Sequence, residues 1–207
     1  MITMEDGENM FQSQLEEFFI TGTYTDAKEL VGELCASSRE TICSLVSRIE
    51  QKNITTSTIP QYSSFDDGTV NLIQFLRMAG NFGPSYLEVG RHYLENGHTE
   101  RAYIKYGENH AKVSELLGTT TIKKEDRKRV YLNEIGYEIE KLSTDKQHEC
   151  FIKLSGRIPI VQYAIKNDIV SDRDLEEVLG RFLSPSTALR RRRNTWYLIS
   201  ALRGDEN

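Results

Sequence analysis

The sequence predicts a mainly α-helical fold with short β wings, organised as tandem winged helix-turn-helix units. Three observations lead to this prediction. Apolar residues recur at helical spacing through most of the 207 residues. Short turns separate successive amphipathic helices, which is the helix-turn-helix pattern. Two β-prone stretches with a charged run between them follow one helix pair, and this order predicts a two-stranded wing.

The first unit is predicted over residues 1–67. Its helices are expected at residues 10–20, from residue 26 onward with Thr25 as N-cap, and at 39–51, each with apolar residues three or four positions apart. A short turn joins the second helix to the third. The β-branched stretch 54–59 is expected to form a wing strand, and the polar stretch 63–68 a linker.

The second unit is predicted over residues 68–143 and follows the same plan. Its helices are expected at 69–79, 86–94 and 100–117, with Thr99 as N-cap of the last and Gly118 as the residue that ends it. Strands are expected at 119–123 and 129–132, so that the charged run 124–128 forms the tip of a wing. A short helix at 136–142 completes the unit.

The third unit is predicted over residues 144–207 and has no wing. A long helix at 146–166 is expected to bend near Gly156 and Pro159. The remaining helices are expected at 172–182, capped by Ser171, and at 186–203, opened by Ser184 and Pro185. The three units share an architecture but no repeated sequence of fixed period.

Charge is distributed unevenly along the chain. The formal net charge is −5. Residues 1–60 hold 4 basic and 10 acidic residues, a net of −6, whereas residues 146–207 hold 11 basic and 8 acidic residues, a net of +3. Four consecutive arginines, 190–193, concentrate the positive charge. A local basic stripe, rather than the whole-chain sum, is what meets phosphate, so the net charge does not exclude a nucleic-acid partner.

The second helix of a helix-turn-helix unit protrudes, and its N-terminal half fits the DNA major groove. In the third unit this helix begins with hydroxyl side chains and continues with long donors. The predicted DNA contacts there are Ser184, Ser186, Thr187, Arg190, Arg191, Arg193 and Asn194. Four consecutive arginines span more than one helical turn, so at least one of them is expected to pair with a carboxylate instead. A solvated basic face held by salt bridges is the alternative interpretation.

The second unit offers a weaker set of donors. Its predicted contacts are Thr99, Arg101, Lys105, Asn109 and Lys112 on the helix, and Lys123, Lys124, Arg127, Lys128 and Arg129 on the wing. Acidic residues dilute the charge of the helix, and a mobile hairpin is the alternative interpretation of the wing. The first unit is acidic, which favours a protein contact over a DNA contact there.

No motif for catalysis is present. The sequence lacks phosphate-binding loops and the usual protease and hydrolase signatures. Its four histidines have no other potential metal ligands near them at the spacing of a metal site. The runs 126–128 and 138–141 superficially match the acid-x-Lys piece that ends a nuclease motif, but no upstream Pro-Asp step accompanies them. The sequence therefore predicts no enzyme, no metal site and no cofactor; a magnesium-dependent nuclease is the weakest of the possibilities.

The three cysteines, Cys35, Cys43 and Cys150, have no CxxC spacing. They are expected to be reduced thiols of a cytoplasmic protein, with Cys35 and Cys43 as small apolar fillers inside helices. The N-terminal decapeptide is acidic, which is unlike a signal or transit peptide. No apolar run reaches the length that crosses a bilayer, so no membrane partner is expected.

Three segments resemble the tandem winged-helix regions of bacterial and archaeal proteins of DNA restriction and phage defence. They are GHTERAYIKYGENHAKVSELLG (97–118), RVYLNEIGYEIEKL (129–142) and LSPSTALRRRRNTWYLISAL (183–202). The resemblance covers about residues 68–203. It implies double-stranded DNA recognition, as a regulator or as the recognition component of a restriction or defence system, and it supplies no catalytic residue. The alternative is a protein-interaction adaptor that docks partners, for instance through the acidic first unit, without binding DNA.

Overall fold

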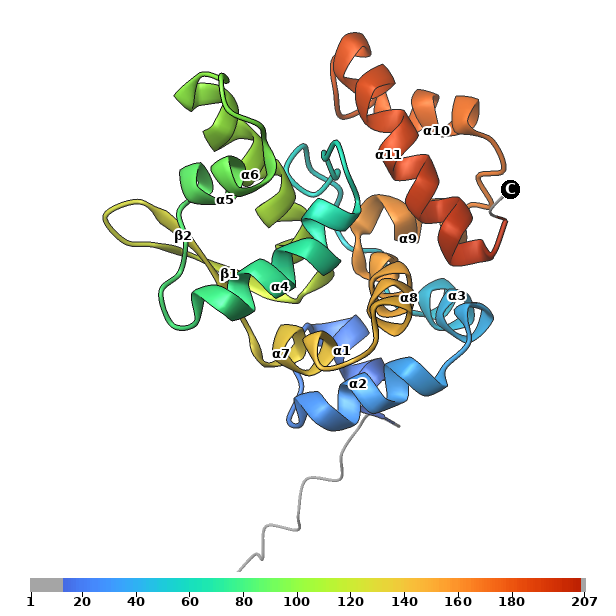
Figure 1. The fold of residues 1–207 in the computed structure, drawn as a ribbon. Coiled ribbons are helices and arrows are strands. Elements are labelled where there is room, and N and C mark those ends of the chain that lie inside the picture. Colours follow the sequence, from blue (N-terminus) through green and yellow to red (C-terminus); the bar gives the residue numbers. More distant parts are fainter. Residues whose placement is uncertain (1–12, 206–207) are drawn as a thin grey trace, which may run out of the picture.

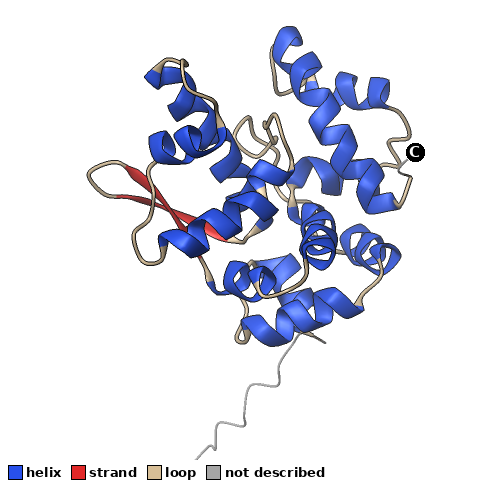
Figure 2. Cartoon of the chain, viewed as in Figure 1, coloured by secondary structure: helices blue, strands red, loops and turns tan. Residues whose placement is uncertain are grey.

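The computed structural model describes residues 13–205. The chain is mainly helical, and the strands in the described part form one small antiparallel hairpin (Figures 1 and 2). The helices are α1 (Gln14–Thr21), α2 (Ala27–Ala36), α3 (Arg39–Arg48), α4 (Val70–Ala79), α5 (Tyr86–Tyr93), α6 (Glu100–Leu117), α7 (Glu134–Glu140), α8 (Thr144–Leu154), α9 (Pro159–Lys166), α10 (Asp172–Leu179) and α11 (Pro185–Arg203), with single 3₁₀ turns η1 (Asp66–Gly68) and η2 (Ser155–Arg157). This confirms a mainly α-helical fold with a short β hairpin.

Side-chain caps set several helix starts. Thr99 and Ser171 accept hydrogen bonds from the backbone N–H groups of the first turns of α6 and α10, as predicted. The predicted cap Thr25 is wrong: Asp26 caps α2 instead, because its carboxylate accepts from two N–H groups. Gly118 ends α6 with a φ of 83°, a left-handed conformation that favours glycine. The start of the first predicted helix, residues 10–12, lies outside the described residues.

The predicted wing strand at 54–59 is wrong, because these residues form a turn. The Thr55 carbonyl oxygen accepts from the Thr58 backbone N–H at 3.1 Å, and the Thr58 hydroxyl accepts from the Thr55 N–H at 2.8 Å. No strand lies beside the segment in the described part of the chain. β-branched residues favour a strand only where a neighbouring strand and a packed face are available. Ile59 is buried under the turn and anchors it to the core.

The hairpin pairs β1 (Thr120–Lys124) with β2 (Lys128–Leu132). In its register Thr120 lies opposite Leu132. An isolated bridge joins Ser85, just before α5, to Arg129 on the other edge of β2, and the Val130 N–H donates to the Pro84 carbonyl at 2.9 Å. The segment from α4 to β2 therefore runs helix, bridge, helix, helix, hairpin.

One large hydrophobic cluster includes side chains from all three predicted units, for example Leu34 of α2, Ile139 of α7 and Leu198 of α11. A smaller cluster lies between α4, α5, α6 and β2, with Leu72, Val89 and Val130 among its members. The unit limits 1–67, 68–143 and 144–207 stay a prediction.

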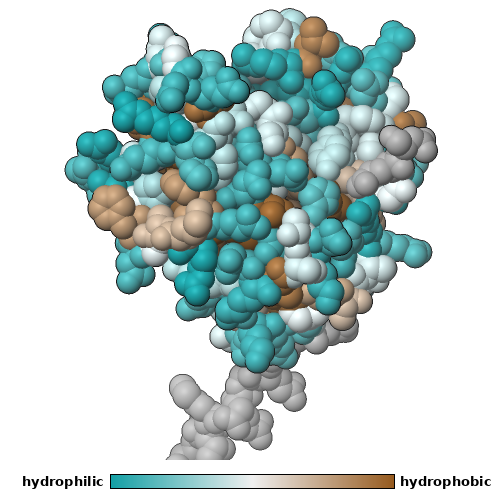
Figure 3. Space-filling model, viewed as in Figure 1, coloured by the Kyte–Doolittle hydropathy of each residue, from teal (hydrophilic) through white to brown (hydrophobic). Residues whose placement is uncertain are grey.

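The face of the molecule shown in Figure 3 is mostly hydrophilic, with scattered apolar patches. Among the residues that the structure describes, no helix combines the length and the apolar character needed to span a bilayer.

Candidate nucleic-acid interface

Two glycines let α5 and α6 cross at backbone contact. A Cβ on Gly90 would lie 1.9 Å from the Tyr103 carbonyl oxygen, and a Cβ on Gly107 would lie 2.0 Å from the Tyr86 carbonyl oxygen. Neither gap admits a methyl group, so each glycine is required by its partner helix. This close crossing fixes the direction of α6 and determines which of its side chains face outward.

The outward face of α6 carries the predicted polar residues. Arg101 is exposed and forms no hydrogen bond or ion pair within the described chain. Lys105 and Lys112 both bind Glu108, at 3.0 and 2.6 Å. Partial burial raises the pKa of Glu108, but the hydrogen bonds from the two lysines outweigh it and hold this pKa below its ordinary value. Glu108 is therefore a carboxylate that offsets part of the positive charge of this face.

The hairpin holds its five basic residues in different ways. Lys124 is exposed without a partner among the described residues, and the Lys123 and Lys128 ammonium groups lie 4.9 and 6.0 Å from aromatic ring centroids. Arg127 pairs with its neighbour Asp126 at 3.3 Å. These four side chains remain near the surface and available to an anion.

Arg129 has a different role from the other hairpin residues. Its side chain is only 17% exposed, donates to the Gly83 carbonyl at 2.9 Å and binds Asp126 at 3.2 Å. The guanidinium also lies 5.1 Å from the Phe82 ring centroid. Its donors therefore hold the loop before α5 against β2, and a DNA contact would have to compete with these bonds.

The four arginines of α11 point in different directions. Arg190 and Arg193 are exposed and have no hydrogen bond or ion pair within the described residues. Arg192 binds Asp172 at 3.3 Å and Glu176 at 2.5 Å, both on α10. This confirms that at least one arginine of the run pairs with carboxylates, and it leaves Arg190 and Arg193 as the open cations of the helix.

Arg191 and Asn194 face the segment between α3 and α4. One Nη of Arg191 donates to the carbonyl oxygens of Thr56 and Ile59, both at 2.8 Å. Burial, followed by the charge of the adjacent arginine, lowers the pKa of Arg191. The Asn194 amide donates to the Tyr62 carbonyl, and the Tyr62 hydroxyl returns a bond to the Asn194 carbonyl at 2.8 Å. These two predicted contact residues thus fasten the turn to α11.

The N-terminus of α11 has the hydroxyl groups that the sequence predicted. Ser184 is the N-cap residue and Pro185 is the first helical residue. The Ser184 hydroxyl donates to the Thr187 hydroxyl at 3.0 Å, and it caps no backbone N–H. Ser186 is exposed. The first N–H groups of this 19-residue helix therefore have no side-chain cap within the described chain.

A cleft of about 70 Å³ joins the two predicted helix surfaces. Lys105, Asn109 and Lys112 line it from α6, and Arg191 lines it from α11. The turn between α3 and α4 forms its floor with Thr56, Ser57 and Gln61, among others. Three cations and no carboxylate line the cleft, while Glu108 lies beside it. The sequence placed these residues in separate units; the structure brings them together.

His110 is a buried residue of α6 that the sequence did not single out. Its Nδ1 lies 2.8 Å from the Tyr106 carbonyl oxygen, and its Nε2 lies 3.3 and 3.4 Å from the N–H groups of Ser63 and Ser64. Nδ1 therefore donates, and Nε2 accepts from the loop. Burial lowers the pKa of His110, so the neutral ring is favoured. The ring joins α6 to the segment that forms the floor of the cleft.

Within residues 13–205 no group of three or more His, Cys, Asp or Glu side chains could hold a metal ion. No family model matches the chain, and neither a curated protein nor a solved structure matches it.

Proposed function

We propose that the protein binds double-stranded DNA and that α4 to β2 forms a winged-helix unit. The helix, bridge, helix, helix, hairpin order supports this assignment, since it supplies a protruding helix with a wing beside it. In this proposal α6 enters the major groove. The hairpin cations, Lys124 and Arg127 above all, contact the phosphate backbone.

The observation that carries the proposal is the cleft shared by α6 and α11. Cations from both helices line it, so the two surfaces act as one positive strip instead of two weak ones. Arg101 at the start of α6, and Arg190 and Arg193 on α11, add unpaired charge on the same two helices. A strip of this kind attracts a polyanion even though the whole chain is acidic.

The biological role follows the resemblance noted in the sequence. We propose a regulator, or the DNA-recognition component of a restriction or defence assembly, acting in the cytoplasm. The acidic segment 1–60 is the surface proposed for a protein partner, because its net charge of −6 repels phosphate.

A fluorescence-anisotropy titration of the full chain against a mixed-sequence duplex of about 30 base pairs tests the proposal. Binding at low salt that weakens steeply at moderate salt is expected, because each phosphate contact releases counterions. No binding at low salt would refute the proposal and favour the protein-interaction adaptor. A pull-down from lysate would then look for the partner.

A matched pair of variants tests the site. Arg190→Ala with Arg193→Ala removes two unpaired charges from α11, and Lys28→Ala with Lys146→Ala removes two exposed charges from α2 and α8. The first variant should lose affinity for every duplex and flatten the salt dependence, since two phosphate contacts are lost. The control should bind nearly as the unaltered chain does. Equal losses in both variants would show a general charge effect and refute the assignment of the site.

A further inference from the structure

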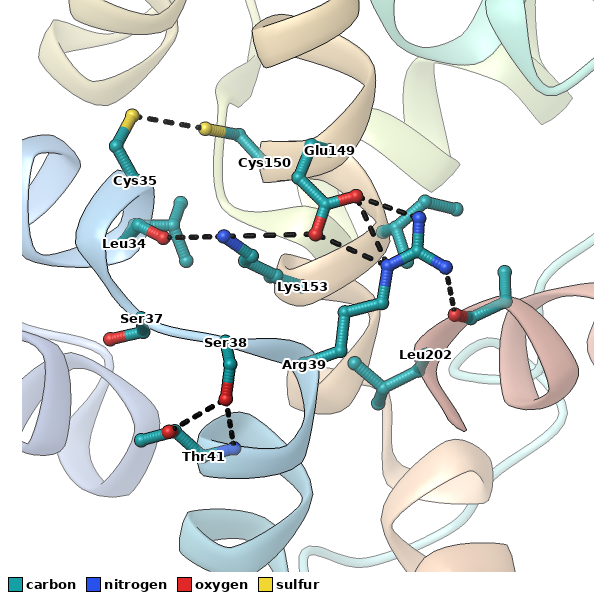
Figure 4. A network of polar contacts seen from close by, with 12 residues as sticks. Leu34, Cys35, Ser37, Ser38, Arg39, Thr41, Glu149, Cys150, Lys153 and Leu202 are labelled. Atoms are coloured by element: carbon teal, nitrogen blue, oxygen red, sulfur yellow. Dashed lines mark hydrogen bonds and ion pairs between the residues drawn. The ribbon is translucent and has the colours of Figure 1, made fainter. Parts of the chain in front are cut away.

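Two cysteines from distant parts of the chain lie in contact. The Sγ of Cys35, near the end of α2, is 3.7 Å from the Sγ of Cys150 in α8, although 115 positions separate them in the sequence (Figure 4). Cys150 is 1% exposed, whereas Cys35 is exposed to solvent. The expectation that Cys35 is an apolar filler is therefore wrong, because the residue is exposed at the surface of α2.

Polar contacts of α8 with the end of α2 and the start of α3 flank the two thiols. The buried Lys153 ammonium donates to the Leu34 carbonyl oxygen at 3.0 Å, one residue from Cys35. Arg39, the first residue of α3, binds Glu149 at 2.7 Å, one residue from Cys150. The first bond ties the end of α2 to α8, and the second ties the start of α3 to α8, so both lie close to the sulfur pair. The proposed bond requires the two sulfurs to approach from 3.7 Å to the bonding distance of about 2.05 Å.

We propose that Cys35 is a site of oxidation by hydroperoxides and that it closes to a reversible disulfide with Cys150. The thiolate of Cys35 attacks one peroxide oxygen, the O–O bond breaks, and the departing hydroxide takes up a proton to leave as water. The product is a sulfenic acid on Cys35. The sulfur of Cys150 then attacks the Cys35 sulfur, the S–O bond breaks, and the hydroxide leaves with the Cys150 proton as a second water.

This step balances: two thiols lose two electrons and two protons, and one hydrogen peroxide becomes two waters. We assign the first attack to Cys35 because this residue is exposed, whereas Cys150 is buried. Burial, then the neighbouring Cys35 sulfur, raises the pKa of Cys150, so Cys150 stays a thiol until the sulfenic acid forms beside it.

The disulfide would tie α2 to α8 covalently and close a loop of more than a hundred residues. A long closed loop restricts the unfolded chain most, so the oxidised protein should unfold at a higher temperature than the reduced one. The inference is independent of the DNA-binding proposal, since neither cysteine lines the cleft.

The test treats the full chain with hydrogen peroxide and counts free thiols after denaturation. Three thiols should fall to one, the mass should fall by two hydrogens, and peptide mapping should find residues 35 and 150 linked within one chain. Dithiothreitol should restore all three thiols. The melting temperature should rise on oxidation and return on reduction.

Matched variants separate the roles of the cysteines. Cys43→Ser is the control and should still form the bond, because the Cys43 Sγ contacts the Leu202 carbonyl oxygen and not another sulfur. Cys35→Ser should abolish the bond, and Cys150→Ala should leave a sulfenic acid on Cys35 that dimedone traps. Three thiols that survive peroxide, a bond to Cys43, or a linkage between two chains would each overturn the proposal. Peptide mapping of the unaltered chain distinguishes these outcomes even if a variant fails to fold.

Discussion

Replacing Gly90 by alanine should force α5 and α6 apart. The added methyl carbon would lie 1.9 Å from the Tyr103 carbonyl oxygen, whereas ordinary contacts of this kind begin at 3.4 Å. The helices would have to separate by about 1.5 Å at their crossing, and a close-packed interior resists such a shift. The obstacle is backbone, so no side-chain rotation can relieve the clash.

The size of the effect follows from two opposing terms. Overpacking of a tight contact costs about 1–3 kcal/mol, and a backbone obstacle places Gly90→Ala at the upper end. Alanine in place of glycine within a helix returns about 0.5–1 kcal/mol. The net loss is therefore about 2 kcal/mol. For a chain of this size it lowers the melting temperature by about 4–8 °C.

Thermal unfolding followed by circular dichroism measures this shift, and Gly32→Ala is the matched control. Gly32 lies within α2, and a Cβ there would meet nothing within 4 Å. The control should therefore raise the melting temperature by about 1–4 °C, through helix propensity alone. A Gly90→Ala variant that melts at or above the unaltered protein would refute the close crossing of α5 and α6.

Three further predictions concern charged and titrating groups. Glu108→Gln should raise duplex affinity several-fold in the anisotropy assay, because it removes the carboxylate that neutralises two lysines of α6; Glu177→Gln, an exposed residue of α10, should change it little. Burial lowers the pKa of His110 in the folded protein. As the pH falls below about 6.5, the histidine of the unfolded chain therefore binds a proton before that of the folded chain does, and the unfolding free energy should decrease. Urea unfolding at several pH values should show this slope in the unaltered protein and a flatter one in His110→Asn. Arg39→Met should lower the unfolding free energy by about 1–3 kcal/mol in urea, because it leaves the half-buried Glu149 without its bidentate partner; an unchanged midpoint would contradict this role.

Helix periodicity and capping residues predicted most of the local structure. The break at Gly156 and Pro159 appears as η2 between α8 and α9, and Pro185 opens α11 as expected. These features depend on neighbours in the sequence, so the sequence contains them. The prediction of a strand at 54–59 was wrong because a strand depends on a partner strand that the local sequence does not specify.

The candidate site shows the same division between local and distant information. The surface position of Arg190 and Arg193 was predictable from the run of arginines. The sequence could not predict that Arg191 binds the turn at Thr56 and Ile59, because those carbonyl groups are more than a hundred positions away. The shared cleft with α6 is likewise a product of tertiary packing. The contact between Cys35 and Cys150 could not be predicted either, because the sequence shows two cysteines but not that they lie side by side.

The salt dependence of duplex binding tests the central claim most directly. One variant removes Arg101 and Lys124 from the α6 side, a second removes Arg190 and Arg193 from α11, and a third removes all four; each of these side chains is exposed and unpaired among the described residues. If α6 and α11 form one DNA-binding strip, each double variant should lower the slope of log affinity against log salt by up to about 2, and the third by about twice that. A duplex affinity that neither pair changes, or a protein that binds no duplex at low salt, would contradict the account.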